Sequence, residues 1–114
     1  MNYTVLNKDE LPSDGNTYEF EGLHFQDTGV SFIWVDMPTG GSVRLHKHPY
    51  KELFIIQEGV STFTVDTTTL EAVAGQIIIV PADVPHKFMN NGPVQLRQID
   101  IHISKEFITN WLED

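Results

Sequence analysis

Short apolar segments separated by turn residues make up most of this chain, and they predict strands rather than helices. The segments that we expect to form strands are 30–37, 42–48, 52–57, 60–66, 77–80, 86–89 and 94–103. Gly, Pro, Asn and Asp gather between them, as at 38–41, 81–83 and 90–93. Many short strands at close spacing, without helices between them, indicate an all-β sandwich or barrel.

Two of the expected strands differ in how their polar and apolar residues are arranged. Segment 53–56 is apolar at every position, which predicts a strand buried on both faces near the centre of a sheet. In segment 94–103 the isoleucines at 99, 101 and 103 share one face of the strand. The polar residues Gln98, Asp100 and His102 share the other face.

The end of the chain shows a different periodicity, which predicts a short C-terminal helix on the outside of the barrel. Ser104 is suited to cap such a helix, and Glu106 lies in its first turn. The apolar stripe of this helix comprises Phe107, Ile108, Trp111 and Leu112. At the other end of the chain, we expect residues 3–6 to form a strand that adds to a sheet edge, either in the same chain or in a partner.

Length and composition predict a single domain that covers residues 1–114. With 40% hydrophobic residues the chain can bury one core. No apolar run approaches the roughly 20 residues of a membrane span. The first residues lack the pattern of a signal peptide. With no cysteine, disulfides and thiolate metal sites are excluded. A cytoplasmic location is the expectation from these features.

Sixteen acidic and seven basic residues give the chain a formal net charge of −9. A protein with this charge repels phosphate backbones and anionic membrane surfaces, so we expect neither nucleic acid nor a membrane as a partner. The charges are scattered rather than grouped in a tail. The expected partner is therefore a small molecule.

Three of the five histidines and one glutamate occupy positions that can converge on one point. His46 and His48 are two residues apart, so on a strand both side chains leave the same face. Glu52 begins the next strand after a short turn, and His86 begins a strand that can lie opposite the pair. Three imidazoles and a carboxylate suit one divalent ion such as Fe, Mn, Ni or Zn. In an octahedral ion this set leaves positions open for water or substrate.

Two stretches of the chain carry a family resemblance. Residues 40–59 read G-x5-H-x-H-x3-E-x6-G, with the defined positions at Gly40, His46, His48, Glu52 and Gly59. Residues 75–90 read G-x5-P-x-D-x2-H-x3-N, with the defined positions at Gly75, Pro81, Asp83, His86 and Asn90. They resemble the first and second cupin motifs, although the second cupin motif has Gly where this chain has Asp83. Because Asp tolerates left-handed backbone better than most residues, we expect this turn to survive the change.

The resemblance to the cupin superfamily implies a fold, a metal site and an assembly. The implied fold is the cupin double-stranded β-helix, a jelly-roll barrel of six to eight strands, here with the short C-terminal helix. The implied metal ligands are His46, His48, Glu52 and His86. By resemblance to other small cupins, we also expect a two-fold homodimer that uses the N-terminal segment or an outer sheet face.

Strand parity suggests which other side chains line the cavity beside the metal. Residues that share a face with a ligand are the candidates, because alternate side chains of a strand point the same way. By this argument the pocket candidates are Arg44, Phe54, Ile56 and Phe88. Gln98 and His102, on the polar face of segment 94–103, are added to them. Trp34 and Met37 are lesser candidates on the same argument. His24 and His102 match no motif, and a packing or surface position is the favoured interpretation of both.

Two functions remain open at this point, because this fold hosts many chemistries. The favoured interpretation is a metal-dependent enzyme that acts on a small molecule, with dioxygenase, isomerase or lyase type chemistry. The alternative is a non-catalytic domain that binds or senses a small molecule. The sequence fixes no general acid or base near the ligands, and catalytic residues beyond the metal group are not identified.

Overall fold

The computed structural model describes residues 2–114, and it is built from ten strands and two single turns of 3-10 helix. The helical turns are Lys8–Glu10 and Gly22–His24. The strands are β1 (Thr17–Phe20), β2 (Ser31–Met37), β3 (Ser42–Lys47), β4 (Glu52–Glu58), β5 (Val60–Val65), β6 (Thr68–Val73), β7 (Ile77–Val80), β8 (His86–Met89), β9 (Leu96–His102) and β10 (Asn110–Trp111).

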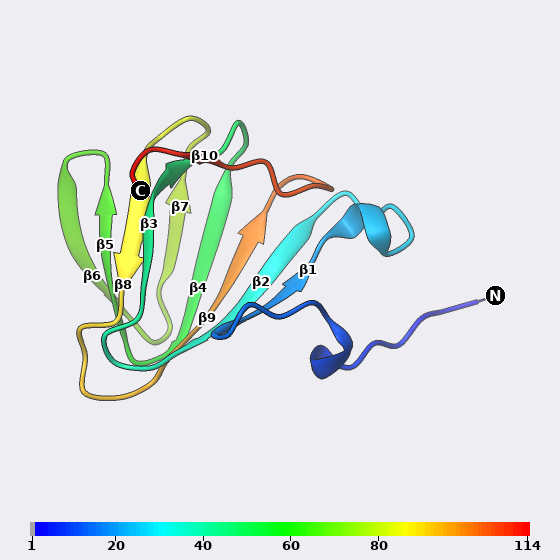
Figure 1. Ribbon diagram of the computed structural model, residues 1–114, viewed down its shortest axis with the longest axis horizontal. Helices are drawn as coiled ribbons and strands as arrows, with labels where there is room; N and C mark the ends of the chain where they lie inside the picture. Colours follow the sequence, from blue (N-terminus) through cyan, green and yellow to red (C-terminus); the bar gives the residue numbers. More distant parts are fainter. Residues whose placement is uncertain (1) are drawn as a thin grey trace.

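The strands form two antiparallel five-stranded sheets that face each other as a jelly-roll barrel (Figure 1). One sheet has the order β1-β2-β9-β4-β7 and the other has the order β10-β3-β8-β5-β6. Consecutive strands often lie in different sheets, so the chain repeatedly crosses from one layer to the other. The segment after β9 runs over one open end of the barrel before it reaches β3 (Figure 1).

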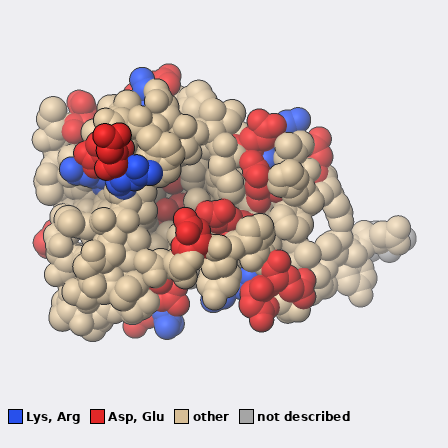
Figure 2. Space-filling model, in the orientation of Figure 1, with Lys and Arg blue, Asp and Glu red and all other residues tan. Residues whose placement is uncertain are grey.

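Acidic side chains are spread over the surface in separate groups, with few basic ones among them. Figure 2 shows this distribution on one face of the molecule. The few surface ion pairs include Arg97, which lies 3.5 Å from Asp36 and 3.4 Å from Glu58. Exposed pairs of this kind contribute little to stability. The negative charge predicted from the composition is therefore mostly solvated.

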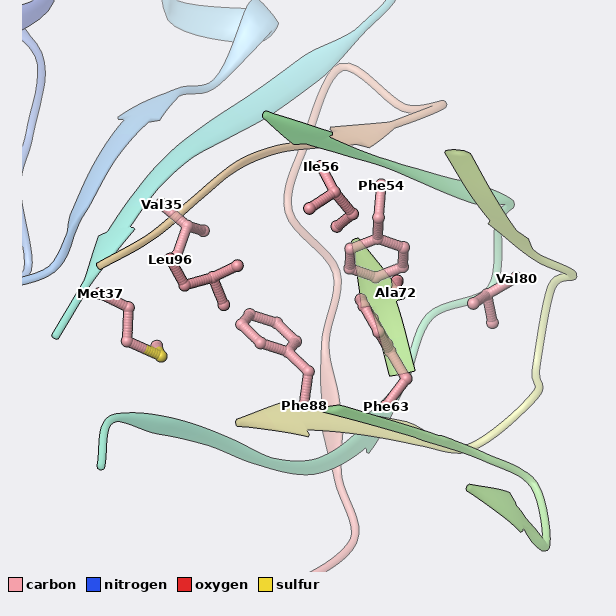
Figure 3. Packing of buried hydrophobic residues seen from close by; sticks show 9 residues of the cluster. All are labelled: Val35, Met37, Phe54, Ile56, Phe63, Ala72, Val80, Phe88 and Leu96. Atoms are coloured by element: carbon pink, nitrogen blue, oxygen red, sulfur yellow. The ribbon is translucent and has the colours of Figure 1, made fainter. Parts of the chain in front are cut away.

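The hydrophobic core fills the space between the two sheets at one end of the barrel (Figure 3). It consists of Val35, Met37, Phe54, Ile56, Phe63, Ala72, Val80, Phe88 and Leu96. The rings of Phe54 and Phe63 meet edge to face at 4.8 Å, a favourable aromatic geometry. These residues occupy the alternate, inward positions of their strands. The core therefore closes one end of the barrel and leaves the other end to polar groups.

The seven strands predicted from the sequence are confirmed, with ends that differ by at most two residues. The sequence pattern missed β1 and β6. In β6 the threonines at 68 and 69 looked like part of a turn, but the turn ends at Thr67, after Asp66 adopts a φ of 54°. The hairpin therefore needs only two loop residues, and β6 pairs with β5 from Thr68 onwards.

The prediction of a C-terminal helix over 104–112 is wrong. This segment is irregular up to the short strand β10, which pairs with β3. Isolated helices this short are marginal, and here the backbone finds partners in other elements instead. The Phe107 N–H donates to Glu21, the Ile108 N–H donates to the Tyr50 hydroxyl, and the Leu112 N–H donates to the Leu45 carbonyl. We call residues 103–112 the C-terminal strap.

Residues 3–6 do not form the predicted strand within this chain. Tyr3 is 85% exposed and Val5 is 77% exposed, and the segment extends away from the barrel (Figure 1). Its pairing with a second chain remains a prediction. None of the helices described between residues 2 and 114 is long and apolar enough to span a membrane.

Two turns show why the motif residues are needed. Gly59, between β4 and β5, has a φ of 82°, and a Cβ there would lie 2.5 Å from the Gln95 carbonyl oxygen. Only glycine fits such a site. Asp83 has a φ of 65°, as expected for a residue that replaces the motif glycine. Its N–H donates to the His48 carbonyl at 2.7 Å, so this turn is fixed against the neighbouring loop.

Candidate metal centre

The four predicted ligands come together in the interior of the barrel. His46 lies in β3, His48 directly after it, Glu52 at the start of β4 and His86 at the start of β8. All four are buried, and one potential ligand atom from each lies within 4.8 Å of the others. The register of the sheets explains this, because His46 pairs directly with His86 across β3 and β8. Residues 40 positions apart in the sequence are thereby placed face to face.

A backbone carbonyl fixes the tautomer of each histidine in this group. Nδ1 of His46 lies 2.6 Å from the Arg44 carbonyl oxygen, and Nδ1 of His86 lies 2.9 Å from the Val84 carbonyl oxygen. Nδ1 of His48 lies 2.8 Å from the Ile108 carbonyl oxygen. A carbonyl only accepts, so Nδ1 carries the proton in all three rings. In its neutral form each of these rings then turns the lone pair of Nε2 towards the centre, as metal-binding histidines do.

The Glu52 carboxylate lies against these lone pairs. Its Oε1 is 3.1 Å from Nε2 of His48 and 3.0 Å from Nε2 of His86. Nε2 of His48 is buried and has no aligned hydrogen bond. Lone pairs and a carboxylate at this distance need a proton or a metal cation between them, because two electron-rich groups repel each other; Nε2 of His86 and Oε1 of Glu52 lie at hydrogen-bonding distance. A divalent ion meets this requirement for all four side chains at once.

The protonation states of the group also suit a metal ion. Burial lowers the pKa of His46 to about 4, although its bond to the Arg44 carbonyl opposes the shift. Burial by itself raises the pKa of Glu52, but its close contacts with His102, His48 and His86 outweigh burial and hold it well below the ordinary range. At neutral pH the group therefore offers a neutral His46 and an ionised Glu52, the forms in which these residues bind metals.

A cavity of about 290 Å³ opens directly beside this group. His46, His48 and Glu52 form its floor, and the C-terminal strap forms part of its wall. The other lining residues are Asp14, Thr17, Glu19, Ile33, Val35, Val43, Phe88, Asp100, His102, Phe107, Thr109 and Trp111. The cavity is thus mixed in character, with apolar walls and several oxygen-bearing groups, and its size suits a small molecule.

One wall of the cavity carries a buried acidic residue, Asp100, and a half-buried one, Glu19. Asp100 is buried and accepts a hydrogen bond from Gln98 at 2.8 Å. Burial, and then the charge of Glu52, raises the pKa of Asp100 well above its ordinary value. Burial, followed by the charges of Asp14 and Glu21, also raises the pKa of Glu19. The cavity therefore contains carboxyl groups in an environment that disfavours further negative charge.

The structure divides the predicted pocket residues into three groups. Phe88 and His102 line the cavity. Phe54 and Ile56 lie in the hydrophobic core below it. Gln98 is fully buried and reaches the cavity only through Asp100. Of the lesser candidates, Met37 belongs to the core and Trp34 lies on the opposite face of β2.

Arg44 lies outside the cavity, and a β-bulge is the reason. The pairing of β3 with β8 shifts register between Val43 and His46, so strand parity does not hold across this stretch. As a result Val43, and not Arg44, joins His46 in the lining. The Arg44 guanidinium lies over the Trp111 ring, 4.5 Å from its centre, on the exterior.

Sequence reasoning did not single out several residues that the structure places at the site. Tyr50 lies in the turn between His48 and Glu52, and its hydroxyl is 2.7 Å from Nδ1 of His102. Its position inside the first motif was the available signal. Glu19 and Phe107 had no signal, because β1 was not predicted and the strap was expected to be a helix.

Comparison with known proteins agrees with this architecture. Residues 33–102 match the protein family described as "Cupin domain". This chain belongs to the cupin family. It is 37% identical to an uncharacterised protein of Methanocaldococcus jannaschii over 62 residues. These residues make up 54% of this chain and 50% of that protein. It is 33% identical to the polyketide synthase CurC of Streptomyces cyaneus over 69 residues. These residues make up 60% of this chain and 44% of that protein. The cupin chain thus matches about half the length of these relatives.

Solved structures of the same fold include metal enzymes. An oxalate oxidase superimposes with a TM-score of 0.78 at 17% identity, over 95% of this chain and 63% of that one. The oxalate decarboxylase of Lactobacillus farciminis, in its formate complex, gives a TM-score of 0.80 at 19% identity, over 91% of this chain and 34% of that one. At this level of identity the likeness shows the cupin fold.

Proposed function

We propose that this cupin is a metal-dependent enzyme that acts on a small molecule by dioxygenase, isomerase or lyase type chemistry. The observation that carries the proposal is the buried group His46, His48, Glu52 and His86, of which the first three line a cavity of about 290 Å³. When bound there, a divalent ion supplies a Lewis acid that polarises a substrate oxygen. Bacillus subtilis oxalate decarboxylase, a structural neighbour, has Mn(II) centres, so Mn(II) is the first ion to test.

The protein's own groups then bind and orient the substrate. Phe88 and Ile33 give the cavity apolar walls, and the C-terminal strap shields it from bulk water. Because Oδ1 of Asp100 accepts from Gln98, a proton on this carboxyl group resides on Oδ2. A buried carboxyl group in this state can donate a hydrogen bond to a substrate oxygen, which an ionised one cannot do.

The charge of the lining indicates the class of substrate. Among the described residues that line the cavity, Asp14, Glu19, Glu52 and Asp100 are acidic and none is Lys or Arg. A dianion such as oxalate, after which the structural neighbours are named, would lack a basic side chain to balance its second charge. We therefore propose an uncharged or cationic substrate that offers an oxygen to the metal.

Metal analysis followed by turnover assays tests this function. Elemental analysis of protein purified without an affinity tag should find one divalent ion per chain. The metal-loaded protein should convert a member of a panel of neutral and amine-bearing hydroxy and oxo compounds, and should leave oxalate unchanged. Chelation or His86→Ala should abolish turnover, and His24→Ala should retain it. Binding of the same compounds without any product would contradict the enzyme and favour a binding or sensing domain.

A further inference from the structure

A fourth buried histidine, His102, lies against the candidate metal centre without belonging to it. The group whose ligand atoms lie within 4.8 Å of one another contains His46, His48, Glu52 and His86. Nε2 of His102 is 3.0 Å from Oε2 of Glu52, the carboxylate oxygen that the other histidines do not face. His102 is only 3% exposed.

Strand pairing places His102 beside the glutamate. His102 on β9 pairs directly with Glu52 on β4, so the backbones hold the two side chains next to each other. The Phe107 ring packs edge-on against the imidazole, with ring centres 4.9 Å apart. The position of the imidazole is therefore set by the sheet on one side and by the C-terminal strap on the other.

The hydrogen bonds around Tyr50 determine which nitrogen of His102 carries the proton. The Tyr50 hydroxyl oxygen accepts the Ile108 N–H at 3.2 Å, so its own proton is free to be donated. The two acceptors within reach are Nδ1 of His102 at 2.7 Å and Nδ1 of His48 at 3.4 Å. Nδ1 of His48 already donates to the Ile108 carbonyl, so it cannot accept. The Tyr50 proton therefore goes to Nδ1 of His102.

It follows that His102 holds the opposite tautomer to the three histidines of the group. With Nδ1 accepting from Tyr50, the neutral ring carries its proton on Nε2, which faces Oε2 of Glu52. The Nε2–H of His102 then lies 3.0 Å from Oε2, although the two are not aligned as a hydrogen bond in this structure. Oε1 instead faces Nε2 of His48 and His86.

We infer that His102, held by Tyr50, is a positioning residue that engages Oε2 of Glu52 and presents Oε1 alone to the metal. This inference rests on the proposed metal-dependent function. Its consequence is a glutamate that binds through one oxygen, which keeps a coordination position open for the substrate. Partners of this kind typically change metal affinity by 10- to 100-fold when they are removed.

Histidine NMR of the metal-free protein tests the tautomer independently of any metal. Long-range ¹H–¹⁵N spectra at about pH 8, above the ordinary histidine pKa of about 6.5, distinguish the two neutral forms. We expect His102 to carry its proton on Nε2, and His46, His48 and His86 to carry theirs on Nδ1. In Tyr50→Phe the His102 proton should no longer be confined to Nε2. A His102 with its proton on Nδ1 in the parent protein would overturn the inference.

Metal titrations of two matched variants test the positioning role. His102→Leu keeps an apolar side chain of similar reach but removes the N–H donor, whereas His102→Gln restores a donor near Nε2. We expect His102→Leu to weaken Mn(II) binding by about 10- to 100-fold and to alter the Mn(II) EPR spectrum. His102→Gln should restore the affinity to within a few-fold and should recover the parental spectrum. Circular dichroism of both variants verifies that the barrel is folded.

The remaining outcomes separate the inference from the proposed function. A His102→Leu protein with parental affinity and spectrum would overturn the positioning role. Loss of affinity in both variants, together with loss of one nitrogen coupling from the metal spectrum, would make His102 a ligand and would also overturn it. A parent protein that shows the Nε2 tautomer but binds no metal would overturn the proposed function, while the assigned tautomer of His102 and its contact with Glu52 would stand.

Discussion

Asp100 is a single side chain whose surroundings link the site to the stability of the barrel. Burial, and then the charge of Glu52, raises its pKa well above the ordinary value. The folded protein therefore retains a proton that the unfolded chain releases above about pH 3.9. The stability that this group contributes is fully present below that pH, and it is lost as the pH rises through the raised pKa of the folded state.

Asp100→Asn should remove this pH-dependent loss. The asparagine side chain does not ionise, and its oxygen can still accept the Gln98 hydrogen bond. We expect the variant to melt above the parent protein at neutral pH, with a gain that shrinks to nothing as the pH falls to about 4. Melting scans in chelator between these limits measure it. A gain of equal size at both ends would show that ionisation of Asp100 is not its cause.

The ligand residues should determine how much a metal ion stabilises the fold. An ion at one hundred times its dissociation constant stabilises the folded state by about 2.7 kcal/mol. In a domain of this size that is a rise in melting temperature of the order of 10 °C. We expect His48→Ala and His86→Ala to lose most of this rise while the apo barrel stays folded. His24, whose side chain is 67% exposed, is the matched control, and its replacement by Ala should retain the rise. If His86→Ala keeps the full chelator-sensitive shift, the ion is bound elsewhere.

Some of these residues could be identified from the sequence and others could not. His46, His48, Glu52 and His86 stand at fixed motif spacings, so local sequence was sufficient to group them. The role of His102 depends on its pairing, across neighbouring strands, with Glu52, which lies 50 positions away in the sequence. Such a pairing follows from the whole topology and has no local pattern.

Among the secondary-structure elements, the C-terminal strap is the part that the sequence pattern described least well. Its apolar spacing fitted a helix, but the side chains are used differently: Phe107 packs on His102, and the Trp111 ring lies 5.0 Å from the His46 ring. Of the four residues in the predicted apolar stripe only Phe107 is half-buried, and Ile108, Trp111 and Leu112 are exposed. The bulge in β3 misled strand parity in a similar way, because one extra residue exchanges the two faces.

Metal binding should reduce the mobility of the strap. Nδ1 of His48 donates to the Ile108 carbonyl, and the strap amides of Ile108 and Leu112 donate to Tyr50 and Leu45. An ion that fixes His48 therefore also fixes its bonded partner in the strap. We expect amide hydrogen exchange in residues 104–112 to slow when the metal is added. Residues 68–73, on the edge strand β6, are the control and should exchange at an unchanged rate. Equal exchange of the strap with and without metal would contradict this coupling.

For the whole molecule, the outer face of the β1-β2-β9-β4-β7 sheet is apolar across all five strands. Strand register aligns ten large side chains in two rows on the face opposite the core. One row is Phe20, Phe32, Ile101, Leu53 and Ile79, and the other is Tyr18, Trp34, Ile99, Ile55 and Ile77. Contiguous apolar surface of this kind is unusual on a monomer.

This face is where we place the homodimer expected from the sequence. Light scattering at micromolar concentration should give about twice the chain mass of 12.9 kDa. Ile55→Glu, near the middle of the face, should give a monomer, because it buries a charge in an apolar interface. Val94→Glu is the control, since Val94 is 51% exposed and lies outside the two rows. A parent protein that is only monomeric, or a dimer unaffected by Ile55→Glu, would contradict the assignment.

The carbonyls that hold Nδ1 of His46, His48 and His86 belong to β3, the strap and the loop before β8, so the donor set is complete before any ion arrives. Small metal domains whose ligands are disordered without metal must fold around the ion. Their metal binding is then limited by the rate of that folding, and part of the binding free energy is spent on it. We therefore expect no folding step to accompany binding here. The rate of loading is then set by entry into the cavity and by the release of water from the ion, and the ion can be exchanged without unfolding the protein.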